Sequence, residues 1–297
     1  MQSLKTLRFG CWVICFLFSI TACVSSPQAA TESPIKVMAA ESFLTNITQQ
    51  VAGERLHIDG LIPAGLEPHS YEPTPQDIAR VADSDLLIIS GGGLEGWLKN
   101  ILTNIGGSDK IIEASSGLVA KNGDPHFWLD PNNVLVYVDN IRDALIKIDP
   151  LGKDVYSSNA ETYKQKLREL DAWIQQEVEK IPPHQRLLVT NHETLGYFAD
   201  RYGFEIIGSV LSSLSSEASP SAQQLAQLRD AMRAHSAKVI FLNISDNPQL
   251  AEQIAAETQA KVITGLYSES LSPADGPAST YLEMMKYLVT VIVNALQ

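Results

Sequence analysis

The chain has 297 residues, enough for two domains of ordinary size, and 45% of them are hydrophobic, enough for a substantial core. Its 18 glycines and 15 prolines are ordinary for a globular protein, which excludes fibrous and disordered classes. The 34 acidic residues outnumber the 22 basic ones and give a formal net charge of −12. No nucleic-acid partner is expected, because phosphate backbones would repel such a chain.

The first 22 residues have the pattern of a secretory signal peptide. Lys5 and Arg8 precede a short apolar run, residues 11–18, and small residues follow it. The run is shorter than the roughly 20 apolar residues that span a membrane. The end of the segment, Ile20 to Cys23, resembles the lipobox of bacterial lipoproteins, in which the cysteine is lipidated and becomes the new N-terminus.

Cysteine usage favours the lipoprotein interpretation. The cysteines are Cys11, Cys15 and Cys23, so only Cys23 would remain after cleavage, and neither a disulfide nor a thiolate metal site could form. Lipidation of Cys23 would account for this single remaining thiol, and more than one acyl chain would hold the protein at the membrane. The alternative is a plain secretory signal cleaved near Ala29–Ala30. Residues 23–34 are small and polar, and we expect a flexible tether.

Short apolar runs alternate with helical patterns from residue 35 onward. Strands are expected at 35–39, 56–62, 86–90 and 110–113, and helices beginning near 44 and covering 77–83 and 97–105. Strands that alternate with helices are typical of a parallel sheet. Residues 35–152 are therefore predicted to form an N-terminal α/β lobe.

A single long helix is expected to follow this lobe. Apolar residues recur at steps of three and four from Ala160 to Ile181, and Pro182–Pro183 ends the pattern. At 1.5 Å per residue this stretch alone is roughly 30 Å long, about the width of a small domain. We therefore expect residues 153–181 to form a helix that links two lobes.

The α/β alternation resumes after the prolines and predicts a C-terminal lobe over residues 182–297. Strands are expected at 187–190, 205–210, 238–242 and 261–264, and helices at 195–202, 219–235, 250–258 and after 280. The predicted fold class is α/β, with two lobes of largely parallel sheets joined by one long helix. A cleft between lobes is the expected ligand site.

Three of the six histidines occur in a setting typical of functional sites. His69 and His192 follow predicted strands, and His126 lies in a loop between prolines. Open α/β sheets place ligands at loops beyond the carboxyl ends of their strands. A shared metal site is one interpretation and ordinary loop histidines are the other; separations of 57 and 66 residues exclude a compact metal-binding finger. The remaining histidines are interpreted as solvated or capping residues: His57, His184 and His235.

A glycine-rich turn resembles a nucleotide-binding motif. Gly91 to Gly96 fits G-x-G-x-x-G, and Glu113 stands 20 residues after Gly93. The turn follows the third strand of its lobe rather than the first, and Glu95 places a carboxylate where a pyrophosphate would bind, so a plain turn is favoured. Neither H-E-x-x-H nor G-x-S-x-G occurs in the sequence, which leaves little support for hydrolytic chemistry.

Several stretches of the chain resemble the zinc/manganese-type solute-binding lipoproteins of bacterial ABC metal importers, the ZnuA/TroA-like family. These stretches are residues 60–75, 124–131, 189–192, 196–198, 219–221 and 280–285. The resemblance extends from about residue 35 to the C-terminus. It implies a monomeric metal receptor rather than an enzyme, anchored to the cell membrane on its periplasmic or outer-surface side. An importer permease and its ATPase would be its partners.

The resemblance also implies four metal ligands, two from each lobe. They carry over to His69 and His126 from the first lobe and to His192 from the second. The fourth is a carboxylate in residues 266–271, where the family usually has aspartate and this chain has Glu269. Glutamate is longer by one methylene, so a shifted geometry is expected, or water in its place. We expect the loop that carries Glu269 to be mobile until metal fixes it.

The donor set predicts the cargo. Three imidazoles and one carboxylate suit tetrahedral Zn²⁺, whereas manganese prefers more oxygen ligands, and manganese-type members of the family tend to have an acid at the His192 position. Zinc is therefore the expected ion, with Mn²⁺ or Fe²⁺ as alternatives. Four protein ligands would leave no place for an activated water, so binding is expected rather than catalysis. Two further functions stay open at this point: an adhesin-type surface lipoprotein and, more remotely, a zinc hydrolase.

Overall fold

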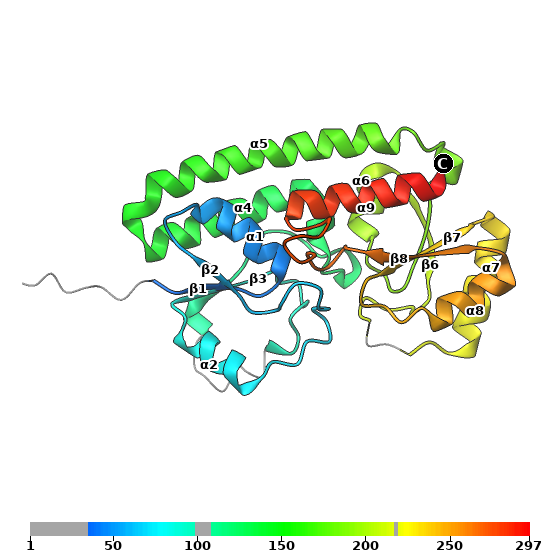
Figure 1. Cartoon of the computed structure of the whole chain (residues 1–297), viewed down its shortest axis with the longest axis horizontal. Helices are drawn as coiled ribbons and strands as arrows, with labels where there is room; N and C mark the ends of the chain where they lie inside the picture. Colours follow the sequence, from blue (N-terminus) through cyan, green and yellow to red (C-terminus); the bar gives the residue numbers. More distant parts are fainter. Residues whose placement is uncertain (1–34, 99–107, 217–218) are drawn as a thin grey trace, which may run out of the picture. The chain divides into compact units, whose positions relative to one another are not determined.

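The computed structural model describes residues 35–98, 108–216 and 219–297 (Figure 1). The predicted signal peptide, Cys23 and the tether lie outside these residues, and so does most of the helix predicted at 97–105. Among the helices in the described ranges, none combines the length and the apolar character that crossing a bilayer requires.

The first lobe is built on a parallel sheet with the strand order β2-β1-β3-β4. Its strands are β1 (Val37–Ala39), β2 (Ile58–Gly60), β3 (Leu86–Ile89) and β4 (Ile111–Glu113). The two central strands, β1 and β3, are buried along their whole length, which explains their unbroken apolar sequences. Helices α1 (Ser42–Ala52) and α2 (Pro75–Asp83) follow β1 and β2.

Helix α4 (Pro131–Ile148) is absent from the sequence prediction, although it is 18 residues long. Its start signals are ordinary: Asp130 accepts a hydrogen bond from the backbone N–H of Asn132, and Pro131 occupies the first turn. Its buried positions, from Val134 to Leu145, recur at helical steps. The helix lies directly after the loop of His126 and therefore fixes the end of that loop.

The predicted long helix is confirmed as α5 (Lys153–Val178), which has 26 residues. It ends at Val178, a few residues before the prolines that were expected to stop it. Its buried side chains contact α1 and α4 of the first lobe, α6 of the second, and the last helix, α9. Figure 1 shows α5 running along both lobes with α9 beside it, so one rigid element supports the whole molecule from residue 35 onward.

The second lobe repeats the first, with a parallel sheet of order β6-β5-β7-β8. Its strands are β5 (Leu187–Thr190), β6 (Glu205–Ser209), β7 (Val239–Asn243) and β8 (Lys261–Leu266). Its helices are α6 (Gly196–Tyr202), α7 (Ala222–His235), α8 (Gln249–Thr258) and α9 (Tyr281–Leu296). The predicted start of α7 at residue 219 is wrong by three residues, because Ser221 and Gln224 form a reciprocal capping box.

Short 3₁₀ turns connect several of these elements. They are Ser108–Lys110, Lys121–Gly123, Phe127–Leu129, Pro150–Gly152 and Pro183–Gln185. The turn Phe127–Leu129 is wholly buried and begins immediately after His126. The residues that follow His126 are therefore enclosed by the hydrophobic core.

The largest hydrophobic core belongs to both lobes. Trp128, which is fully buried, stacks on Phe43 of α1 with ring centroids 4.5 Å apart. Its indole Nε1–H donates to the carbonyl of Ser268 in the second lobe, at 2.7 Å, and its own carbonyl accepts from the hydroxyl of Tyr281 at 2.6 Å. Trp128 thus joins the loop of His126 to the loop that carries Glu269.

Candidate metal centre

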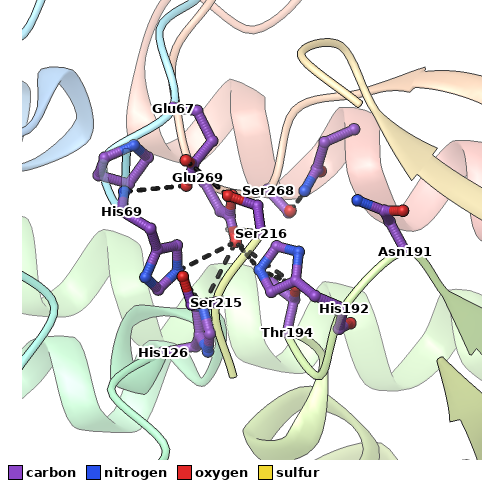
Figure 2. Close-up of polar contacts among 12 residues, drawn as sticks. Glu67, His69, His126, Asn191, His192, Thr194, Ser215, Ser216, Ser268 and Glu269 are labelled. Carbon is purple, nitrogen blue, oxygen red and sulfur yellow. Dashed lines mark hydrogen bonds and ion pairs between the residues drawn. The ribbon is translucent and has the colours of Figure 1, made fainter. Parts of the chain in front are cut away.

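The structure brings the four sequence-predicted ligands together. One ligand atom from each of His69, His126, His192 and Glu269 lies within 4.8 Å of every other (Figure 2). His192 and Glu269 directly follow β5 and β8, and the loops of the other two follow β2 and β4. All four therefore come from segments beyond the carboxyl ends of parallel strands. The sequence pattern predicted this setting for the three histidines, whereas Glu269 was expected only from the family resemblance.

One carboxylate oxygen is the centre of the cluster. Glu269 Oε1 lies 2.7 Å from His192 Nε2, 3.3 Å from His126 Nε2 and 3.8 Å from His69 Nε2. The Nε2 atoms of His69 and His126 are 3.0 Å apart. All four side chains are at most 6% exposed. Three nitrogens and one oxygen at these separations are a donor set that a single transition-metal ion can bind.

Asp124 orients the imidazole of His126. Its Oδ1 accepts from His126 Nδ1 at 2.7 Å and from the backbone N–H of His126 at 2.9 Å, which turns Nε2 toward the cluster. Tyr197, on α6 of the second lobe, donates its hydroxyl to the carbonyl of Asp124. Gly196 leaves the room for this carboxylate, because a Cβ there would lie 2.5 Å from Asp124 Oδ2.

Glu67 fixes the loop of His69 in a similar way. Its Oε1 accepts from the backbone N–H of His69 at 2.9 Å, and its Oε2 accepts from the N–H of Ser70 at 3.0 Å. The hydroxyl of Ser216, in the second lobe, also donates to Oε2 at 2.7 Å (Figure 2). Glu67 therefore connects the first-lobe ligand loop to the opposite lobe.

The charges of the cluster are mutually dependent. Burial lowers the pKa of His69 to about 4. Burial also opposes a charge on His126, but hydrogen bonds to Asp124 and Glu269 outweigh it and raise the pKa of His126 to about 9. Despite its own burial, Glu269 has a pKa held well below its usual range by His192 and His126. A divalent cation that binds here at neutral pH must displace protons from imidazole.

The segment that carries Glu269 is held by both lobes, in contrast to the mobile loop expected from the sequence. In addition to the bond from Trp128, the Ser268 hydroxyl donates to Asn243 Oδ1 at 2.5 Å. On the other side, Ser270 Oγ accepts from the backbone N–H of Gly65 at 2.6 Å, a contact with the first lobe. The position of the carboxylate is therefore built into the fold.

An acidic hollow of about 530 Å³ lies beside the cluster. Glu67 and Ser70 line it from the first lobe, and Asn191, Ser216 and Asp246 line it from the second. It contains two carboxylates, and no basic side chain is among the described residues that line it. Such a surface concentrates cations near the ligand loops.

The other three histidines and the glycine-rich turn lie outside the cluster. His57, His184 and His235 are exposed, and none of them belongs to the cluster. In the glycine-rich turn, Glu95 Oε1 accepts from the backbone N–H of Ser90 at 2.6 Å. The carboxylate of Glu95 thus uses turn amides that a phosphate would need, so the interpretation as a plain turn is confirmed.

Sequence reasoning missed one polar side chain inside the cluster. The hydroxyl of Thr194 lies 2.8 Å from His192 Nε2 and 3.4 Å from Glu269 Oε1. Its only sequence signal is its place two residues after His192 in the same loop. Threonine rarely ligates transition metals, so a search by residue type passes over it.

Two α/β lobes on a single long helix, with a buried cluster of imidazoles and one carboxylate between them, define the substrate-binding receptors of metal importers. The chain belongs to the ZnuA family, described as the periplasmic component A of the zinc-uptake complex, whose family model matches residues 37–295. Proteins of this class are receptors and not enzymes, which removes the zinc-hydrolase alternative.

Named relatives carry different metals. The manganese-binding lipoprotein MntA of Halalkalibacterium halodurans is 31% identical over 95% of this chain and 98% of its own length. The iron-binding protein YfeA of Yersinia pestis is 32% identical over 94% of this chain and 91% of its own. The manganese ABC transporter substrate-binding lipoprotein PsaA of Streptococcus anginosus is 26% identical over 97% of this chain and 99% of its own.

Solved structures share the fold. A cadmium-bound periplasmic metal binding protein from Candidatus Liberibacter asiaticus superimposes with a TM-score of 0.80 at 32% identity. The match covers 88% of this chain and all of that one. The family is thus fixed by sequence and by fold, while the metal differs among its members.

Proposed function

We propose that this protein captures a divalent transition metal outside the cytoplasm, Zn²⁺ in the first place, and delivers it to the permease and ATPase of an ABC importer. The observation that carries the proposal is the convergence of three imidazole Nε2 atoms on Glu269 Oε1 in a buried cluster. Imidazole suits zinc well, and four donors at these distances match its preference for four ligands. Mn²⁺ and Fe²⁺, the ions named for relatives, are the alternative cargo.

The burial of the ligands supports a role in capture and release. Each lobe contributes two ligands, so an ion bound by all four holds the lobes together. Release would require the ligand loops to separate, an event that docking on a permease can drive. The lipoprotein signal with Cys23 would keep the receptor, as a monomer, beside that permease.

Metal titration of the chelator-stripped protein tests this function. One Zn²⁺ per chain is expected by elemental analysis after dialysis, and the melting temperature should rise. A hundredfold excess over Kd stabilises a fold by about 2.7 kcal/mol. His192→Ala should abolish both effects, while His235→Ala, which alters an exposed histidine of the same lobe, should keep them.

Competition among ions tests the choice of cargo. Zn²⁺ is expected to displace Mn²⁺ and Fe²⁺ from the wild-type protein under anaerobic conditions. Stripped protein that binds none of the three ions would refute the receptor function. Tighter binding of Mn²⁺ than of Zn²⁺ would refute only the choice of zinc.

A further inference from the structure

Thr194 has an unusual environment for a threonine. It lies in the loop between β5 and α6, is only 2% exposed, and directs its hydroxyl into the ligand cluster (Figure 2). Its Oγ1 is 2.8 Å from His192 Nε2, the nitrogen that faces the proposed ion, and 3.4 Å from Glu269 Oε1. The hydroxyl is therefore as close to these two donors as neighbouring ligands of one ion are to each other.

Among the residues that the structure describes, the Thr194 hydroxyl has no strong hydrogen-bond partner outside the cluster. The carbonyl of His192 is 3.4 Å from it, at the limit of a hydrogen bond, and already accepts from the hydroxyl of Thr190 at 2.6 Å. Within the described part of the chain, its only other partners are the two side chains of the cluster. Glu269 Oε2 is also buried without a hydrogen-bond partner among the described residues. The cluster therefore has donor capacity beyond four ligands.

Simple geometry shows that one ion can touch all three atoms. Thr194 Oγ1, His192 Nε2 and Glu269 Oε1 form a triangle with sides of 2.8, 3.4 and 2.7 Å. The circle through its corners has a radius of about 1.75 Å, shorter than the roughly 2.0–2.2 Å of zinc–nitrogen and zinc–oxygen bonds. A position at bonding distance from all three atoms therefore exists, just outside the plane of the triangle.

We infer that Thr194 supplies a fifth, oxygen donor to the cargo ion and thereby widens the range of metals that this site accepts. The inference rests on the proposed function, because it names a further ligand of the same site. A neutral hydroxyl oxygen adds little for zinc, which is satisfied by four ligands. It adds more for Mn²⁺, which favours oxygen donors, and for Fe²⁺, which accepts more than four ligands. Thr194 thus reduces the advantage of zinc over these ions.

Substitution of Thr194 tests this role. Thr194→Val keeps the shape and removes the oxygen, Thr194→Ser keeps the oxygen, and Thr258→Val makes the same chemical change at a buried threonine of α8 away from the site. Affinities for Mn²⁺ and Zn²⁺ are measured by competition with a chromophoric chelator, on the full-length mature protein. Thr194→Val should weaken Mn²⁺ binding about tenfold or more, the usual size of such effects, and Zn²⁺ binding much less. Thr258→Val should match the wild type, and Thr194→Ser should recover the Mn²⁺ affinity that Thr194→Val loses.

A spectroscopic measurement separates ligation from mere packing. Co²⁺ bound by five ligands absorbs weakly in the visible, and Co²⁺ bound by four absorbs strongly, so Thr194→Val should intensify the band. If Thr194→Val does not fold, Thr194→Ala provides the same comparison. An unchanged Mn²⁺/Zn²⁺ affinity ratio together with an unchanged Co²⁺ band would overturn the inference. Loss of all metal binding in wild-type protein would instead refute the proposed function.

Discussion

The carboxylate of Asp124 determines how the imidazole of His126 faces the other ligands. It accepts the Nδ1–H of that ring, and its negative charge makes the opposite nitrogen a better donor to a metal. Asp124→Asn keeps an oxygen acceptor but removes the charge. Zinc affinity should therefore fall by about 10–100-fold, with the ion still bound.

Chelator competition measures this loss, and Asp200→Asn is the matched control. Asp200 is exposed and pairs with Lys121 on the surface, so its substitution should leave zinc affinity unchanged. Equal affinities in the two variants would mean that the negative charge of Asp124 contributes nothing to metal binding.

Glu41 is a second residue with an unusual charge state. It is 1% exposed, and the carboxylate of Glu95 lies beside it. Burial and the charge of Glu95 raise the pKa of Glu41 well above its ordinary value. The folded state therefore holds a proton that the unfolded state releases above its own pKa of about 4.3.

This extra proton makes the free energy of unfolding depend on pH. Since the folded state binds more protons, the free energy of unfolding falls as pH rises above about 4.3, by up to about 1.4 kcal/mol per pH unit. Glu41→Gln removes the contribution of Glu41 to this dependence, although Glu95 keeps a pKa raised by burial, and the variant should be more stable than the wild type at pH 8, with a smaller difference at pH 5. Urea unfolding at both pH values measures it. Glu54→Gln, at an exposed site, should behave as the wild type, and a destabilised Glu41→Gln at pH 8 would contradict the argument.

At the scale of elements, the sequence predicts those helices and strands that are determined by their own residues. The apolar runs of β1 and β3 and the long periodic stretch of α5 are visible because each is decided by its own residues. The start of α7 was misplaced because Pro220 suggested a first turn, whereas the capping box of Ser221 determines it. Helix α4 was overlooked despite its cap, and the order of strands in each sheet depends on long-range pairing that no local pattern contains.

The residues of the site likewise include some that the sequence predicts and some that it does not. His69, His126, His192 and Glu269 could be predicted because motifs of a known family carry them, with spacing alone leaving a shared site open. Thr194 could not, because its part in the cluster depends on how the loop after β5 turns back on His192. The mobility expected for the Glu269 loop was likewise inferred from the local sequence. In the structure, contacts from both lobes hold this loop in place.

A buried ionic cluster fixes α5 against its neighbours. Asp171, on α5, accepts from Arg201 Nη2 at 2.6 Å and from the Tyr202 hydroxyl at 2.9 Å, both on α6, and from Asn132 at the start of α4. Asp171→Ala would remove the carboxylate partner of Arg201 and of the Tyr202 hydroxyl in a mostly buried place, while Asn132 would still donate to Asp130. We expect it to lower the free energy of unfolding by about 3 kcal/mol.

Urea unfolding of the metal-free protein checks this value. Glu169→Ala is the matched control on the same helix, because Glu169 is exposed and, among the described residues, bonds only to Gln165 one turn away. Its effect should stay within about 0.5 kcal/mol. A similar small effect for Asp171→Ala would show that α5 is held by its apolar contacts alone.

At the scale of the whole molecule, the lobes are parts of one structure rather than two independent domains. The largest core includes Phe43 of the first lobe, Phe198 of the second and Ile292 of α9. Hydrogen bonds between lobes also surround the ligand loops, among them those of Ser216 to Glu67 and of Trp128 to Ser268. Opening of the site is therefore expected as a small separation of these loops around a common core rather than a wide hinge motion.

The proposed attachment of the receptor to the membrane is also a property of the whole molecule. The lipobox predicts that the anchor is a lipid on Cys23 and that the apolar run before it is removed. Cells that grow with labelled palmitate should therefore label the wild-type protein and the Cys15→Ala variant, whose cysteine lies within the signal. Cys23→Ala should carry no label, and its processed form should appear in the soluble fraction, because nothing apolar then holds it to the membrane. Label in Cys23→Ala, or a processed Cys23→Ala protein that stays with the membrane, would show that the anchor lies elsewhere.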